Sequence, residues 1–330
     1  MAFPPLPLRR LVPLLPLLPL LYGLLAMAWI PPAAAQDAAL NRRDAASLDL
    51  LEDLPPAVSA AASRASGSMG GRDDTDLYGE QEILTRPGRW QPWSVSASLS
   101  GEWQSNAPLS AGNETPDYVW RQSISVRNTW KLSESWYLNA GAAEQTSRYD
   151  RFDVLDFDRL DGDAGVLWIT QPDWHPLLAN WVLGTGASWS RLSEASRFSN
   201  ELLTNTAITG ALARSFILHP HHSLLVSFTS EVSVDASDPL AQRDEYAAQL
   251  AWRAQWSPRW ETTAQARLAY YDYEQHADWN WIGSLGVDYL IGRDFRIGLN
   301  ANWTDNQSDS AVFNYQNASL GASFRLQFRF

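Results

Sequence analysis

The sequence predicts an all-β protein, an antiparallel transmembrane β-barrel of about 12 strands preceded by a mostly disordered N-terminal leader, on three observations. From Trp93 to the C-terminus, apolar and polar residues alternate in segments of strand length, which gives each strand one apolar and one polar face. Tryptophans recur ten residues apart on one face, Trp93 with Trp103 and Trp120 with Trp130, and about ten tilted strand residues span a bilayer. Short and long connections alternate between the segments, as they do in transmembrane barrels.

Composition excludes several classes of protein. The 330 residues suffice for one large β domain, and the absence of cysteine excludes both disulfides and thiolate metal sites. Acidic residues outnumber basic ones by 37 to 25, which argues against a nucleic-acid partner because such partners select a basic face. No apolar run after the N-terminal segment is long enough for a transmembrane helix.

The first 91 residues divide into two predicted segments. Residues 1–35 are predicted to be a secretory signal peptide: Arg9 and Arg10 precede the apolar stretch Leu11–Ile30, and Ala33 and Ala35 form a small-residue cleavage site. Residues 36–91 are rich in Ala, Ser, Asp and Gly, which predicts a flexible periplasmic leader. A docking segment for a periplasmic partner and a lumen plug are the alternatives for this leader. The barrel itself is assigned to residues 92–330.

Twelve strands are predicted from the alternation, although the fourth and sixth are weakly phased and leave ten or fourteen strands open. The predicted ranges are 93–104, 118–130, 135–147, 162–170, 178–191, 201–218, 223–235, 244–257, 259–273, 279–291, 294–303 and 311–330. Tight turns are expected after the even-numbered strands, and longer polar loops after the others. We therefore expect the tight turns and both chain ends to face the periplasm.

The positions of the tryptophans indicate that the apolar faces of the strands contact lipid rather than a second layer of protein. Tryptophans at both ends of an apolar outward band form the aromatic girdles of membrane barrels. The predicted girdle residues are Trp93, Trp103, Trp120, Trp130, Trp136, Trp189, Trp256, Trp260 and Trp303. A soluble sandwich or lipocalin-like barrel with buried tryptophans is the alternative, and it leaves the paired spacing unexplained.

The last strand carries a resemblance to a known class. Its sequence, A-S-L-G-A-S-F-R-L-Q-F-R-F, resembles the terminal strand of bacterial outer-membrane β-barrel proteins, and the porin-like resemblance extends over residues 93–330. It implies a location in the outer membrane of a Gram-negative bacterium. It also implies that the barrel-assembly machinery reads a signal formed by Phe324, Leu326, Phe328 and Phe330. Twelve-stranded members of the class include a phospholipase, a nucleoside channel and arginine-lined channels for acidic oligosaccharides, and no motif here selects one of them.

The strand phase opposite the apolar band defines the predicted lumen. Its permeation candidates are Arg121, Arg127, Glu231, Arg253, Glu261, Arg267, Arg296 and Arg325, with Glu102 and Asp288 as further inward acids. The arginines outnumber the acids, and a positive lining in a narrow pore selects anions. The alternative is that arginines and acids pair across a narrow, packed interior and cancel.

These observations predict an outer-membrane channel for small polar or anionic solutes, including acidic saccharides. The other readings are a structural or export-port component of an envelope assembly and an outer-membrane hydrolase. No enzyme is expected, because His175, His219, His221 and His222 fall in predicted turns and His276 falls in a loop. No cofactor is expected except calcium in the acidic loop Asp150–Asp163, whose carboxylates could supply oxygen ligands. The expected partners are outer-membrane lipid, the barrel-assembly machinery and a periplasmic partner of the leader.

Overall fold

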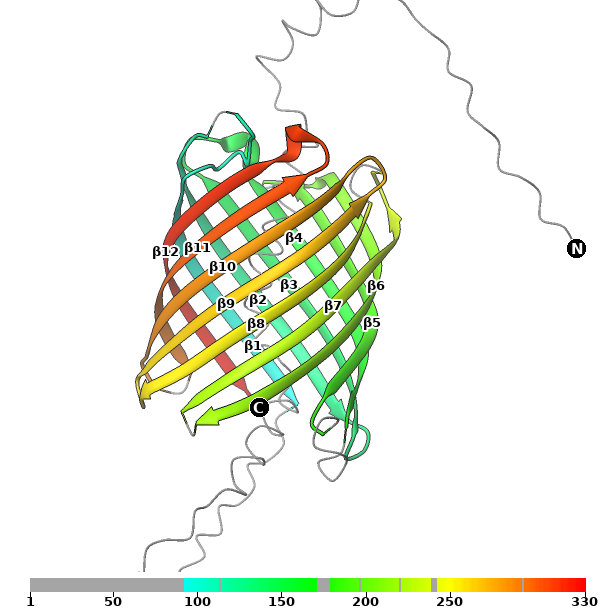
Figure 1. Ribbon diagram of the computed structural model, residues 1–330, viewed down its shortest axis with the longest axis vertical. Helices are drawn as coiled ribbons and strands as arrows, with labels where there is room; N and C mark the ends of the chain where they lie inside the picture. The colour runs from blue at the N-terminus through cyan, green and yellow to red at the C-terminus, as the bar shows by residue number, and fades with distance from the viewer. Residues whose placement is uncertain are drawn as a thin grey trace, which may run out of the picture.

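The computed structural model is a closed barrel of twelve antiparallel strands, as Figure 1 shows. It describes residues 92–112, 114–170, 179–195, 197–219, 221–238, 242–292 and 294–330, and side chains 197–200 are not described. The signal peptide, the leader and His175 lie outside the described residues. The strands are β1 Trp93–Gln104, β2 Asp117–Lys131, β3 Trp136–Tyr149, β4 Phe157–Ile169, β5 Val182–Glu194, β6 Arg197–His219, β7 His222–Ala236, β8 Arg243–Ser257, β9 Trp260–Tyr273, β10 Ala277–Leu290, β11 Phe295–Ser308 and β12 Tyr315–Arg329.

Each strand pairs with its sequence neighbours, and β1 pairs with β12 to close the sheet. Ser94 lies opposite Arg329, and the register runs without a bulge to the pair Gln104 and Ser319. Backbone bonds in both directions between Trp93 and Phe330, at 3.0 and 3.1 Å, complete the seam. Closure leaves no open sheet edge, which is the condition for a sheet to cross lipid.

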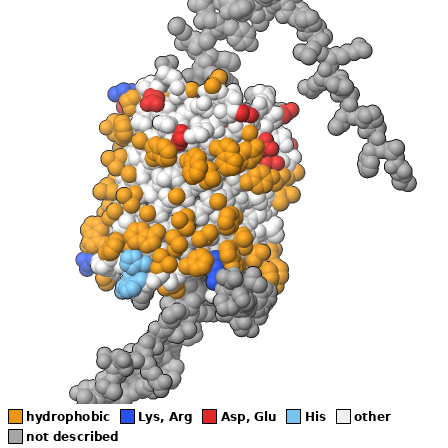
Figure 2. Space-filling model, in the orientation of Figure 1, with side chains coloured by type: hydrophobic (Ala, Val, Ile, Leu, Met, Phe, Trp, Pro, Cys, Tyr) orange, Lys and Arg blue, Asp and Glu red, His pale blue; other side chains and the backbone are white. Residues whose placement is uncertain are grey.

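The outer face is apolar around the barrel. Large hydrophobic side chains are exposed on the outer face of the barrel. They include Leu99, Ile124, Phe228, Leu250 and Leu299. Figure 2 shows them grouped towards the two ends of one face, with acidic side chains beyond the upper group. A soluble protein would bury so much apolar surface, so the barrel is transmembrane. Among the described residues, no helix has the length and hydrophobicity needed to cross a membrane.

We call the end where β1 begins and β12 ends the near rim, and the opposite end the far rim (Figure 1). The predicted difference in loop length between the rims is weaker than expected. The β4–β5 connection at the near rim spans residues 170–181, whereas the far-rim connection between β5 and β6 is only residues 195–196. The prediction was wrong here because β5 and β6 continue their pairing, through a bulge, as far as Glu194 and Arg197.

The predicted fold class and strand number are confirmed, while several boundaries moved. The fourth strand begins at Phe157 rather than Gly162, because the segment 157–161 pairs in register with both neighbours. The last strand begins at Tyr315, after the short 3-10 helix η3 (Ala311–Phe313). A second such helix, η2 (Asp153–Leu155), lies in the β3–β4 connection.

Candidate functional site: the barrel lumen

The structure places all eight predicted permeation residues on the inner face. Directly paired residues of neighbouring strands share a face, and the pairs place Arg121 with Ser100, Arg127 with Ser94, and Arg296 with Arg325. Glu231 lies opposite Glu245, Glu261 opposite Asp288, and Arg267 opposite Gln249. Arg253 lies opposite Thr263. The alternation therefore predicted the inward phase, and the role of these residues in permeation stays a prediction.

Two arginines share one glutamate close to the near rim, and we call Arg253, Glu261 and Arg296 the near cluster. Nη2 of Arg253 donates to Oε2 of Glu261 at 2.6 Å, and Nη1 of Arg296 lies 3.6 Å from Oε1 of the same carboxylate. The carboxylate is covered, with 3 % of its side chain exposed, while 46 % of the Arg253 side chain remains exposed. The cluster thus presents guanidinium groups to the lumen and hides its acid.

A second shared glutamate lies towards the far rim, and we call Arg243, Glu245 and Arg267 the far cluster. Nη2 of Arg243 donates to Glu245 at 3.2 Å, and Arg267 pairs with the other carboxylate oxygen. Both arginine side chains are only 4 % exposed. Arg267 also donates to the Tyr271 hydroxyl at 3.1 Å, and the Arg243 guanidinium stacks 4.1 Å from the Tyr271 ring centre. This cluster is a packed part of the wall.

Other inward arginines pair one-to-one with acids. Arg121 pairs with Glu102, which also accepts from the Asn302 amide at 3.2 Å, and Nη2 of Arg127 lies 3.2 Å from Oδ1 of Asp163. The predicted alternative, in which arginines and acids pair and cancel, therefore describes part of the lumen. In the two clusters, two arginines share one glutamate, and a further acid lies directly opposite that glutamate: Asp288 opposite Glu261 and Glu231 opposite Glu245.

Sequence reasoning missed several charged lumen residues. Arg159, Asp161 and Asp163 lie on β4 with the inward phase of Phe157, and Nη2 of Arg159 donates to Asp161 at 2.7 Å. The alternation in F-D-R-L-D-G-D carries this signal, but the density of aspartates in the segment favours the prediction of an acidic loop. Arg243 and Glu245 lie at the start of β8, one residue before and one after the predicted first strand residue Asp244, and the predicted lumen residues include neither.

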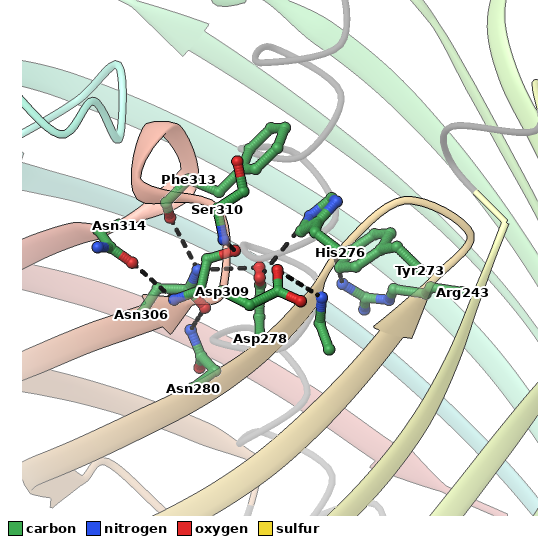
Figure 3. A network of polar contacts seen from close by, with 12 residues as sticks. Arg243, Tyr273, His276, Asp278, Asn280, Asn306, Asp309, Ser310, Phe313 and Asn314 are labelled. Atoms are coloured by element: carbon green, nitrogen blue, oxygen red, sulfur yellow. Dashed lines mark hydrogen bonds and ion pairs between the residues drawn. The ribbon is translucent and has the colours of Figure 1, made fainter. Parts of the chain in front are cut away.

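A buried polar network fastens the far rim, as Figure 3 shows. The His276 ring is stacked between Tyr273 and Phe313, at 4.3 and 4.0 Å between ring centres, and its Nε2 lies 3.7 Å from Oδ1 of Asp278. The Asn306 amide donates to Asp278 at 3.0 Å and to the Phe313 carbonyl at 2.9 Å. The network joins the β9–β10 turn to the β11–β12 loop. It continues into the far cluster through the bond from Arg243 to the Tyr273 hydroxyl.

About half of the predicted calcium loop, Asp150–Asp163, belongs to strand β4. Asp158, Asp161 and Asp163 belong to β4, and in the described part of the chain no three His, Asp or Glu side chains are arranged to hold a metal ion. Asp156, in the true loop, accepts the Tyr149 N–H at 2.7 Å. Burial raises the pKa of Asp156 to about 6, with Arg148 opposing the shift and nearby carboxylates adding to it. Calcium binding stays a prediction.

The outer face carries the other predicted residues. All nine predicted girdle tryptophans are exposed there, and Trp279 and Trp281 of β10, which the prediction omitted, join them. Phe324, Phe328 and Phe330 are exposed and Leu326 is half-buried on the outer face of β12. His219 is the last residue of β6 and His222 the first of β7, so neither lies in a turn, and the His222 ring contacts Trp252 and Trp256.

No protein-family model and no curated protein matches the sequence. Among solved structures, the chain is similar to an outer-membrane channel from Pseudomonas putida F1, with 10 % identity over 73 % of this chain and 99 % of that one and a TM-score of 0.47. It is also similar to the NanC porin, with 11 % identity, coverage of 70 % and 98 % and a TM-score of 0.42. The beta domain of the Bordetella autotransporter BrkA gives 15 % identity, coverage of 72 % and 100 % and a TM-score of 0.38. With scores this low, function has to be argued from the lumen itself.

Proposed function

We propose that the protein is an outer-membrane channel that passes small polar solutes and favours anions, with acidic saccharides among the candidates. The observation that carries this proposal is the water-accessible charge of the lumen. Arg121, Arg127 and Arg253 point inward and keep 20, 24 and 46 % of their side-chain surface exposed. Charges that remained in a dry, packed interior would have lost that surface and would need complete pairing.

The rest of the lining fits a hydrated path. Along β1, the inward residues Ser94, Ser96, Ser98 and Ser100 form a column of hydroxyl groups, two of which bond to serines of β2. On the opposite phase of the same strand, Trp93, Leu99 and Trp103 face outward. Polar-in, apolar-out alternation is the lining of a transmembrane pore.

The direct test is solute uptake by liposomes that contain the refolded mature chain. Swelling should be fast with small neutral sugars, slower as the sugar grows, and faster with small organic anions than with cations of equal size. A barrel shown to be folded by its heat-modifiable migration in gels, yet giving no swelling with any solute, would contradict the proposal.

Deletion of residues 36–91 separates the channel from the export-port reading. A channel should keep its uptake rate when this segment is absent. An assembly component should instead lose a partner that the intact chain retains in detergent extracts. Uptake that required the leader would contradict a simple channel.

A further inference from the structure

We propose that the near cluster is an anion-binding site in the lumen. Arg253 contacts the solute, and Glu261 positions both guanidinium groups. The ligands are small solutes that carry a carboxylate or a phosphate group. This inference rests on the proposed channel function and assigns its selectivity to one place.

Exposure distinguishes Arg253 from the other inward arginines. Its side chain is 46 % exposed, against 20 % for Arg121, 24 % for Arg127, 18 % for Arg296 and 4 % for Arg267. Arg253 therefore offers a solute in the lumen more accessible side-chain surface than any of those arginines. Its exposure also means that the group is hydrated and ready to exchange water for a ligand.

The donors of Arg253 are mostly unused. A guanidinium has five N–H donors, and in the described part of the chain the one hydrogen bond of Arg253 runs from Nη2 to Glu261. The remaining donors suit the paired oxygens of a carboxylate or phosphate, which the planar fork of arginine binds in a bidentate manner. A halide ion would use the charge but not this geometry.

Glu261 positions the arginines without contacting the solute. With 3 % of its side chain exposed, it bonds Arg253 and attracts Arg296 from a third strand, while its charge still lowers the positive potential of the cluster. Arg325 lies directly opposite Arg296 on β12, and Asp288 lies directly opposite Glu261 on β10. The arrangement keeps two guanidinium groups together that would otherwise repel each other.

The experiment measures the reversal potential under a KCl gradient for the mature chain in planar bilayers. Arg253→Gln should lower the anion-to-cation permeability ratio at least about twofold, since it removes an exposed charge from a narrow pore. Glu261→Gln should raise the ratio, because it removes a negative charge from beside both guanidinium groups. Arg259→Gln is the matched control: Arg259 bonds the Tyr289 hydroxyl outside the lumen at the near rim, so its loss should leave the ratio unchanged.

A second readout tests the geometry. Arg253→Lys keeps the charge and loses the fork, so it should preserve the ratio in KCl but raise the concentration of inorganic phosphate that halves the chloride current. The inference is overturned if Arg253→Gln conducts with the ratio of the unaltered chain, or if Glu261→Gln lowers the ratio. Those outcomes would leave the channel standing, whereas absence of current from every folded variant would overturn the channel function itself.

Discussion

The near and far clusters have the same composition and opposite surroundings. Each is built from two arginines that share one glutamate, but the far cluster is packed under Tyr271 and Tyr273 while the near cluster opens to the lumen. In the far cluster the arginines are the covered groups, and in the near cluster the glutamate is. The same ionic triad therefore stabilises the wall where its arginines are buried, in the far cluster, and faces the solute where Arg253 is exposed, in the near cluster.

The largest expected effect that tests the difference between the two clusters is on the free energy of unfolding. Glu245→Gln leaves two arginine side chains, each 4 % exposed, without their carboxylate. Breaking a buried ion pair in this way costs about 3–5 kcal/mol, and we expect urea unfolding in detergent to show a loss of that size. Glu261→Gln should cost less than half as much, because Arg253 can be hydrated where it stands. Equal losses in the two variants would erase the distinction.

A pair of tyrosines sharpens the same comparison. Tyr271→Phe removes the hydroxyl that accepts from buried Arg267, and a lost bond to a charged group costs about 1.5–3 kcal/mol. Tyr289→Phe removes an equivalent bond from Arg259 at 3.1 Å, but that bond is exposed at the near rim. Its loss should change the free energy of unfolding by less than about 0.5 kcal/mol. A costlier Tyr289 variant would contradict the packed character of the far end.

The far-rim network around His276 should contribute less to the free energy of unfolding than the far cluster does. His276→Ala removes two ring stacks, and each aromatic pair is worth about 0.5–1.5 kcal/mol. We expect faster hydrogen exchange in the β11–β12 loop, residues 309–314, with little change at the near rim. His276→Phe keeps the stacks and should restore most of the protection. Unchanged exchange in the loop of the alanine variant would show that the stacks do not hold it.

The smallest expected effect is a pH dependence of the β3–β4 loop. The pKa of Asp156, near 6, is above its unfolded value of 3.8, so folding favours the protonated form. The contribution of this group is fully present below about pH 4 and is lost as the pH rises through 6. Protection factors of the 150–156 amides should fall over that range, and Asp156→Asn should flatten the change while keeping the Tyr149 bond. A rise in protection with pH would contradict the sign.

Strand periodicity predicted the barrel because each residue's face depends only on its neighbours along the chain. The inward phase of Arg253 and Glu261 follows from Trp252 and Trp260 facing out, with no knowledge of the partner strands. The sharing of Glu261 between Arg253 and Arg296 depends on the register of β8, β9 and β11, which the sequence does not display. Burial of Arg243 depends on Tyr271 and Tyr273 of the neighbouring strand β9, whereas Arg267 is bonded by Tyr271 of its own strand.

The measurement that tests the central claim most directly is the single-channel conductance of the refolded mature chain in a planar bilayer with a salt gradient. The proposed channel, with Arg253 exposed in the near cluster, predicts a stable conductance whose reversal potential is biased towards anions. A folded barrel that conducts nothing would contradict the open lumen, and a cation-biased potential would contradict the positive near cluster.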